Sequence, residues 1–365
     1  MKRQVPRRAL LSQPVRPSVR VPLARGSASL GAAVLLSHPD SPKFRLPRVH
    51  LAPLLAFVKP HIDVTFVAVG VTGTLLAWHG AGSLPVLPLT LVVGSVALLS
   101  AGAECWTNLH DRDIDALMPR TARRPLVTGQ ISLRQAALLG AACTAGGLAL
   151  AAALGPIPLL FLAAALINNV VVYSMITKRA TPWSIVMGSV VVPFTLWAGY
   201  AAIRVPIPPA VWLLGAMTGV WVFVHIWVIA LRYRDDYAIA RVPMAPLVWS
   251  KVRLTWALAA SASAMGALAV GALLDLGGPA GRWAAVPVGL ASVVILGGAV
   301  FVPSRERLAG PLVHLITLYL VLVLGVGVGC ALSVPTPRSA GPDVTCNTRA
   351  QACPRSARLE ETTRR

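Results

Sequence analysis

The sequence predicts an all-α, polytopic membrane protein, and three observations support this prediction. The chain has 365 residues, of which 56% are hydrophobic and only 13% are charged. Its mean hydropathy of +0.69 makes it far more apolar than a soluble domain of this length. Apolar runs of about 20 residues, the length that crosses a bilayer as a helix, recur between short polar segments. The composition therefore argues against a soluble fold.

Nine of these runs are predicted to span the membrane, and together they define a helical domain over residues 51–334. Pro and Gly fall mainly between the runs or just inside them, where membrane helices tolerate them. The predicted spans, in order, are Asp63 to Trp78, Leu84 to Cys105, Leu133 to Leu154, Ile157 to Ile176, Trp183 to Ala202, Ala210 to Leu231, Leu254 to Leu274, Trp283 to Val302 and Leu312 to Val334.

The net charge of +20 lies mostly in the tails and in alternate loops. The loops at 79–83, 155–158 and 205–209 carry no fixed charge, whereas the second, fourth, sixth and eighth loops are basic. We assign this excess to membrane orientation and to anionic lipid headgroups, not to nucleic acid. The basic loops are then cytoplasmic or on the matrix side, with the N-terminus inside and the C-terminus outside.

The two ends of the chain are predicted to be disordered basic tails, over residues 1–50 and 335–365. The N-terminal tail lacks an apolar run long enough for a signal peptide. A cytoplasmic tail is favoured over an organelle transit peptide, and a bacterial plasma membrane over the mitochondrial inner membrane. Cys346 and Cys353 then lie in an oxidising compartment, where the sequence leaves a disulfide between them open.

The densest set of charges between two spans lies at 104–130. Asn108, Asp111 and Asp115 are three and four residues apart, which places them on one face of a helix. Two carboxylates so close together beside hydrocarbon need a compensating cation. Oxygen donors with few other protein ligands favour Mg²⁺, which also binds the oxygens of a substrate phosphate. Asp113 faces away from this set and is expected to make a surface pair.

Several arginines follow within the same stretch, and their guanidinium groups suit phosphate oxygens. The positive-inside rule alone would account for these arginines, but it does not explain the aspartates, because acidic residues contribute little to topology. The combination of carboxylates for a metal and arginines for phosphate predicts a diphosphate site.

A second acidic pair, Asp235 and Asp236, lies in a basic loop on the same side of the membrane. We favour Asp236 as a metal ligand, while Asp235 is equally compatible with a loop ion pair. His225 lies inside the preceding span. It is either a hydrogen-bonded packing residue or a site residue that binds the acceptor, ligates a heme iron or accepts a proton.

Both stretches resemble motifs of a known protein family. The first, which reads DRDIDALMPRTARRPLVTGQI, resembles the first aspartate-rich motif of the UbiA superfamily of intramembrane prenyltransferases, in the form carried by heme O synthases. The second stretch, with HIW, DY, A, PM and P, is similar to that family's second motif. Within these two motifs, three residues depart from the family pattern: Thr107 replaces an Asn, Arg241 a Gly and Ala245 a Leu. FVKPHID and YSMITKR extend the resemblance, which covers roughly residues 59–334.

The resemblance implies a UbiA-like bundle of nine helices that transfers an isoprenoid from an allylic diphosphate. In a heme O synthase, the farnesyl group of farnesyl diphosphate is transferred to heme B. The resemblance implies Mg²⁺ as the cofactor, and it implies catalytic roles for Asp111, Asp115, Asp236 and His225, the three aspartates being the metal ligands. It implies a diphosphate site made by Lys59, Asn108, Arg120, Arg124, Lys178 and Arg179.

Alternative functions remain at this stage. The valines at 190–192 fill volume where the family has small residues, which favours a smaller acceptor, such as an aromatic or quinone-like ring, or a membrane terpene cyclase. A transporter would place acidic residues in mid-span, whereas here they gather at the ends of the spans, so this class is a remote alternative.

Overall fold

The computed structural model describes residues 51–79, 82–276 and 278–333, and all regular secondary structure in these ranges is helical. The predicted tails, with Cys346 and Cys353, lie outside the described residues. The elements are α1 (Leu51–Val58), α2 (Pro60–Trp78), α3 (Val86–His110), α4 (Arg112–Leu117), α5 (Leu133–Leu154), α6 (Pro156–Ile167), the π-helix η1 (Asn168–Thr177), α7 (Ser184–Gly188), α8 (Val191–Ala201), α9 (Pro209–Arg232), α10 (Arg234–Ile239), α11 (Ala245–Val248), α12 (Lys251–Asp275), α13 (Gly278–Phe301), the 3₁₀ helix η2 (Glu306–Leu308) and α14 (Ala309–Ser333).

Eight segments of the described chain are long and apolar enough to cross a membrane, and Asp63–Trp78 is a shorter apolar helix. The predicted all-α, multi-pass membrane fold is therefore confirmed. Two predicted spans differ from the structure in detail. The fifth consists of two helices, α7 and α8, interrupted at residues 189–190, and the fourth ends as a π-helix.

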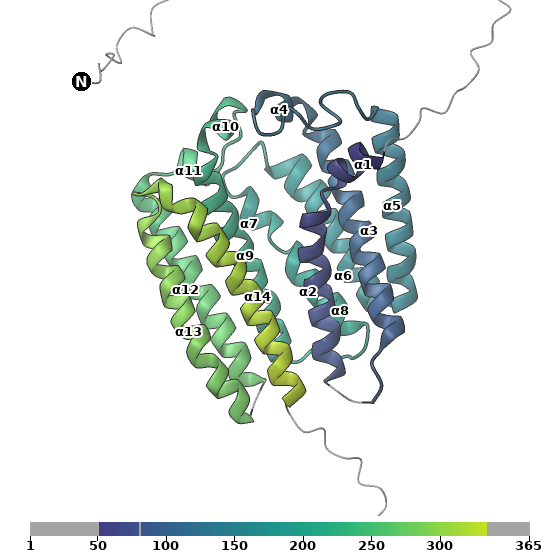
Figure 1. Ribbon diagram of the computed structural model, residues 1–365, viewed down its shortest axis with the longest axis vertical. Coiled ribbons are helices and arrows are strands. Elements are labelled where there is room, and N and C mark those ends of the chain that lie inside the picture. The colour runs from purple at the N-terminus through teal and green to yellow at the C-terminus, as the bar shows by residue number, and fades with distance from the viewer. Residues whose placement is uncertain (1–50, 80–81, 277, 334–365) are drawn as a thin grey trace, which may run out of the picture. The chain divides into compact units, whose positions relative to one another are not determined.

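The helices form a bundle in which α8 packs against α2, α6 and α9, while α12 packs against α9 and α13 (Figure 1). The contact between α2 and α8 is especially close. A Cβ atom on Gly199 would lie 2.0 Å from the carbonyl oxygen of Gly70, so only glycine allows the two backbones to meet. The Thr74 hydroxyl donates to the carbonyl of Gly199 at 3.1 Å and joins the helices there.

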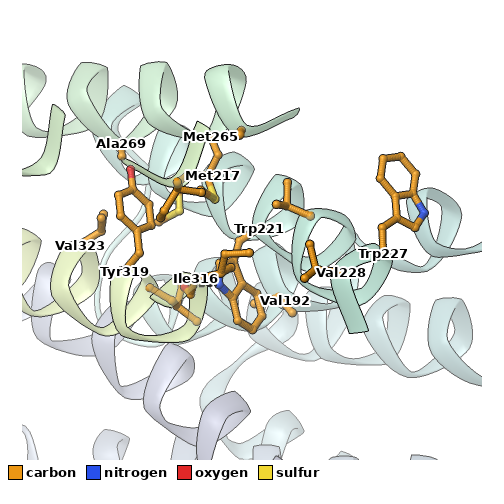
Figure 2. Close-up of a cluster of buried hydrophobic side chains, with 14 of the residues drawn as sticks. Val192, Met217, Trp221, Trp227, Val228, Met265, Ala269, Ile316, Tyr319 and Val323 are labelled. Atoms are coloured by element: carbon orange, nitrogen blue, oxygen red, sulfur yellow. Dashed lines mark hydrogen bonds between the residues drawn. The ribbon is translucent and has the colours of Figure 1, made fainter. Parts of the chain in front are cut away.

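The main hydrophobic core lies between α9, α12 and α14 (Figure 2). Met217, Met265 and Ile316 are fully buried within it. The indole of Trp221 lies beside them and donates to the carbonyl oxygen of Ile316 at 2.9 Å, which satisfies a polar group that burial would otherwise penalise. This core holds α9 rigidly, and α9 carries His225.

The short helices that contain the predicted acidic residues, α4 and α10, lie at the same end of the bundle (Figure 1). The π-helix η1 also ends there, with the amide of Lys178 donating to the carbonyl of Tyr173 at 2.8 Å. π-helical turns recur at functional sites because they reposition side chains relative to an α-helix. One end of the bundle therefore gathers the charged residues that the sequence singled out.

Candidate active site

The first acidic island, which consists of Asp111, Asp113 and Asp115, lies where α3 passes into α4. Asp111 separates the two helices, yet its amide donates to Thr107 and its carbonyl accepts from the amide of Asp115, both at 2.8 Å. This helical hydrogen bonding keeps Asp111 and Asp115 on one face, as their spacing predicted. Both residues are buried, with 3% and 5% of their surface exposed.

Each buried carboxylate is paired with a cation from a distant part of the sequence. The ammonium group of Lys178 donates to Asp111, and the guanidinium of Arg124 donates to Asp115. Because an unpaired charge in such a place costs several kcal/mol, these contacts make the burial possible. Lys178 comes from the end of η1, and Arg124 from the turns after α4.

Asn108 joins the same cluster from one turn earlier on α3. Its side-chain oxygen accepts from Arg124 at 3.1 Å and from Lys59 at 3.2 Å, while its amide donates to the carbonyl of Phe57 at 3.1 Å. Lys59 also pairs with Glu104, a partner that the sequence did not indicate. Burial lowers the pKa of Lys59 from its ordinary value, although Glu104 opposes that effect.

Arg179 occupies the outer edge of the cluster. Its two terminal nitrogens each donate to a carboxylate oxygen of Asp113 at 2.7 Å, and one also donates to the carbonyl of His110. Nη2 of Arg179 also lies 3.8 Å from Oδ1 of Asp111, which is farther than its contacts with Asp113. The hydrogen bonds from Arg179 lower the pKa of the exposed Asp113 carboxyl to about 2. The surface pair expected for Asp113 is thus present, and Arg179 is engaged in it.

The second acidic island, Asp235 and Asp236, is paired with an arginine from the loop after α4. Nε of Arg120 lies 3.9 Å from Oδ2 of Asp236, and the Arg120 guanidinium lies 5.0 Å from the centre of the Tyr233 ring. Asp235 is exposed and has no ion pair within the described ranges. Of the two aspartates, Asp236 is therefore the one with a cation partner from the loop that follows the first island.

The loop after α10 contains a strained residue at a position where the sequence departs from the family pattern. Arg241 has φ of 54°, in the left-handed region that glycine adopts without penalty. Its amide donates to Ala238, and the next amide, that of Val242, donates to Tyr237, which closes the end of α10. The backbone therefore keeps the turn that a glycine would favour, with a large exposed cation on it.

An apolar cavity of about 480 Å³ lies deeper in the bundle, between α2, η1, α7, α8 and α9. His225 lines it, with its ring stacked on Trp221 at 4.7 Å between centroids and with a buried Nδ1 that has no hydrogen-bond partner among the described residues. Tyr173 also lines the cavity, and the Lys178 ammonium lies 5.8 Å from the centre of its ring. The charged cluster and the cavity therefore adjoin at Tyr173.

A smaller cavity of about 190 Å³ continues from the first and shares Phe66, Asn169 and Val191 with it. Glu104 lines its polar side. Sequence reasoning missed Tyr173 and Asn169 as well as Glu104. The available signal was a polar pair, Asn168 and Asn169, inside an apolar run, together with an acid one turn before Asn108.

The donor set suits a hard cation, although the three expected ligands do not converge on one point. Among the described residues, no group of three His, Cys, Asp or Glu side chains lies close enough together to hold a metal ion. Lys178 and Arg124 each contact one oxygen of their aspartate, and Oδ1 of Asp111, which lies 3.8 Å from Arg179, is buried without a hydrogen-bond partner. A buried carboxylate oxygen with an unused lone pair is the kind of donor that Mg²⁺ takes.

Comparison with known proteins identifies the class to which this fold and this site belong. Residues 65–310 match the UbiA prenyltransferase family, and the chain belongs to that family. Solved structures show the same fold. A UbiA homolog from Archaeoglobus fulgidus bound to GPP and Mg²⁺ has a TM-score of 0.61 at 20% identity, covering 77% of this chain and 100% of the homolog. A digeranylgeranylglyceryl phosphate synthase has a TM-score of 0.61 at 16% identity, covering 78% of this chain and 99% of that one.

Within the family, the curated relatives are more specific. A protoheme IX farnesyltransferase from Thermoplasma acidophilum is 38% identical over 183 residues, which are 50% of this chain and 64% of the relative. A protoheme IX farnesyltransferase from Kineococcus radiotolerans is 38% identical over 209 residues, which are 54% of this chain and 57% of the relative. The similarity spans less than two thirds of the length of either relative.

Proposed function

We propose that this UbiA family member transfers a farnesyl group from farnesyl diphosphate to heme B and so makes heme O. The observation that carries the proposal is the position of the paired carboxylates and cations directly beside an apolar cavity that contains His225. Relatives named protoheme IX farnesyltransferases, and a solved UbiA homolog bound to GPP and Mg²⁺, support the same chemistry.

The cations of the cluster would bind the diphosphate. Lys178 and Arg124 contact the buried carboxylates, and Lys59 contacts Asn108, so all three ammonium or guanidinium groups already point into one region. A diphosphate that arrives there would draw these groups onto its oxygens. They would then stabilise the negative charge that builds up on the leaving group as the allylic C–O bond breaks. Arg120 and Arg179 would contribute from the edge.

Asp111 and Asp115 would hold Mg²⁺ with Asn108 assisting, and Asp236 would join them only after α10 moves toward the first island. The metal would draw charge from the diphosphate. Each of these aspartates has a cation beside it in the structure, which for Asp236 is Arg120 from the loop after α4. These cations would turn to the diphosphate when the substrate binds. Arginine and lysine thus have two successive partners, first the carboxylates and then the diphosphate.

The cavity would receive the acceptor and exclude water from the allylic cation. Its volume of about 480 Å³ lies within the range of about 300–1,000 Å³ that is usual for ligand sites. A vinyl carbon of heme B would form the new C–C bond, and water would add to the neighbouring carbon with loss of a proton. His225, with its unpartnered Nδ1, would accept that proton or ligate the heme iron.

A second candidate keeps the diphosphate chemistry with a smaller acceptor. Val191 and Val192 line the cavity, where their branched side chains take up volume that a flat macrocycle would need. An aromatic or quinone-like ring would be the acceptor in that case, or the double bonds of the substrate itself in a cyclisation. These alternatives differ from heme O synthesis in product but not in the diphosphate site.

The charged end of the bundle would face the cytoplasm or the matrix. Four basic loops lie on this side, which the positive-inside rule assigns to the inner face. We favour a bacterial plasma membrane over the mitochondrial inner membrane. Prenyl diphosphates are water-soluble at their head and would then reach the site from the inner compartment.

The test uses membranes from cells that express the chain, given radiolabelled farnesyl diphosphate, Mg²⁺ and heme B. Formation of a hydroxyfarnesyl heme is the expected result, and Asp111→Ala should abolish it, while Asp113→Ala is the matched control at an exposed aspartate two residues away. Diphosphate release without a heme product, still dependent on Asp111, would move the assignment to the smaller acceptor. Absence of any diphosphate release, with longer prenyl donors as well, would contradict both candidates.

A further inference from the structure

A basic pocket outside the proposed active site lies between the end of α9 and the start of α14. We propose that this α9–α14 pocket binds the phosphate headgroup of an anionic phospholipid. Its volume is about 560 Å³, and its walls include Arg232, Glu306, Arg307 and His314. None of its lining residues lines the cavity that contains His225. The two sites are therefore different.

The charge balance of the α9–α14 pocket favours an anion. Arg232 and Arg307 are exposed, and neither pairs with a carboxylate within the part of the chain that the structure describes. The pocket's single carboxylate, Glu306, is already neutralised by a hydrogen bond from Arg234 at 3.2 Å. Two guanidinium groups thus remain available to phosphate oxygens, which they bind through paired N–H donors.

Local packing holds Arg232 of the pocket in place. The Arg232 guanidinium lies 5.6 Å from the centre of the Tyr233 ring, and a Cβ atom on Gly310 would approach its Nη1 to 2.9 Å. Gly310 therefore leaves room for Arg232 against the first turn of α14. The Nδ1 atom of His314 lies 2.9 Å from the carbonyl of Gly310, which fixes the imidazole at the rim.

The position of the pocket favours a lipid over a free anion. It lies where the apolar segment Glu306–Ser333 begins, at the charged end of the bundle, which is the level of the lipid headgroups (Figure 1). Leu308 and Leu315, which directly follow Arg307 and His314 in the sequence, are each 37% exposed and offer an apolar surface to acyl chains. Basic pockets between transmembrane helices on the inner face are recognised sites for anionic headgroups. A phospholipid would contact the basic pocket through its headgroup and the apolar surface through its acyl chains, whereas inorganic phosphate would contact only the basic pocket.

A phospholipid bound in the α9–α14 pocket would lie close to the second acidic island. Glu306, in the wall of the pocket, holds Arg234, the first residue of α10, and α10 carries Asp236. The pocket and the proposed metal ligand are therefore connected through a single ion pair. The binding proposal itself does not depend on the identity of the prenyl acceptor.

Native mass spectrometry of the purified full chain tests the proposal. The chain would be given phosphatidylglycerol or phosphatidylcholine, and bound lipid would be counted. We expect retention of phosphatidylglycerol over phosphatidylcholine, with binding about 30-fold weaker in Arg232→Gln/Arg307→Gln. The matched control, Lys251→Gln/Arg282→Gln, removes the same charge from exposed positions outside the pocket and should bind like the wild type.

Three outcomes would overturn the proposal: equal binding of phosphatidylglycerol by the pocket variant and the wild type, an equal loss in the control variant, or complete displacement of the lipid by inorganic phosphate. The last would indicate an anion site without lipid specificity. Should the double variant not fold, the single variant Arg307→Gln on the exposed η2 segment is expected to weaken binding about fivefold, and no change there would also contradict the proposal.

Discussion

The two acidic islands contain the same residue type at the same end of the bundle, yet they differ in burial and in pairing. Asp111 and Asp115 are almost fully buried and contact cations directly. The Asp236 side chain is 17% exposed and has one cation at 3.9 Å, while Asp235 is exposed. Asp111 and Asp115 of the first island are therefore held in place by packing, whereas the second island is a more exposed segment in which Asp236 has Arg120 as its cation partner.

This difference indicates that the islands contribute unequally. A buried, paired carboxylate keeps its position in every turnover, which favours charge stabilisation without reorganisation. A carboxylate on a short exposed helix can adjust its position when a ligand binds. Variants that affect only one island test this distinction.

The largest effect is expected at the first island. Asp111→Asn should lower diphosphate release by about 10³-fold or more, because it removes a buried charge from the site and leaves Lys178 unpaired. Release of diphosphate from radiolabelled substrate measures this, with Asp113→Asn as the exposed control.

A double variant separates stability from catalysis in that experiment. Asp111→Asn/Lys178→Met removes both charges of the pair, so the unfolding temperature should recover relative to Asp111→Asn while activity stays low. Recovery of activity in the double variant would show that Asp111 serves only to neutralise Lys178.

The next largest effect is expected at the second island. Asp236→Asn should lower activity by about 10²-fold, since it removes the carboxylate of this island that is paired with Arg120 and is proposed to bind the metal. Asp235→Asn, one residue away, should stay within about twofold of the wild type. The same steady-state assay measures both, and the reverse ranking would assign the ligand role to Asp235.

A smaller, stabilising effect is expected beside the second island. Arg241→Gly should raise the free energy of unfolding by about 0.5–1 kcal/mol, because glycine adopts φ 54° without steric cost. The gain is limited because glycine also makes the unfolded chain more flexible. Denaturant midpoints in detergent measure it. Arg241→Ala removes the same cation but keeps the strain, and equal stabilisation in that control would indicate relief of charge repulsion instead.

The smallest effect is expected at the surface pair of the first island. The pKa of Asp113 is lowered to about 2 in the folded chain, below its ordinary value of about 3.9. The Arg179 pair therefore stabilises the fold above about pH 4, and this contribution is lost as the pH falls through about 2. The difference in stability between the wild type and Asp113→Asn should be below about 1 kcal/mol and constant from pH 5 to 8. A difference that changes with pH in that range would contradict the assignment.

The amino-acid sequence alone was enough to predict the membrane fold and most of the residues of the charged cluster. Apolar runs of bilayer length predict helices directly, because a backbone in hydrocarbon must satisfy its hydrogen bonds locally. The spacing of Asn108, Asp111 and Asp115 gave their common face, since side chains three and four residues apart align on any helix. Positions such as Asp113, opposite that face, followed from the same periodicity.

The partners of these residues became known only from the packing of the helices. Lys178 pairs with Asp111, which is 67 positions away in the sequence, and Lys59 pairs with Glu104, which is 45 positions away. Such pairs depend on how helices pack, and helical periodicity carries no information about distances between helices. The π-helix that places Tyr173 between the cluster and the cavity, and the turning of Arg179 to Asp113, likewise depend on neighbouring elements. The local sequence pattern thus identified the candidate groups, and the packing of the helices set the contact that each of them makes. The physical reason is that the free energy of a buried charge depends on its surroundings and not on its position in the sequence.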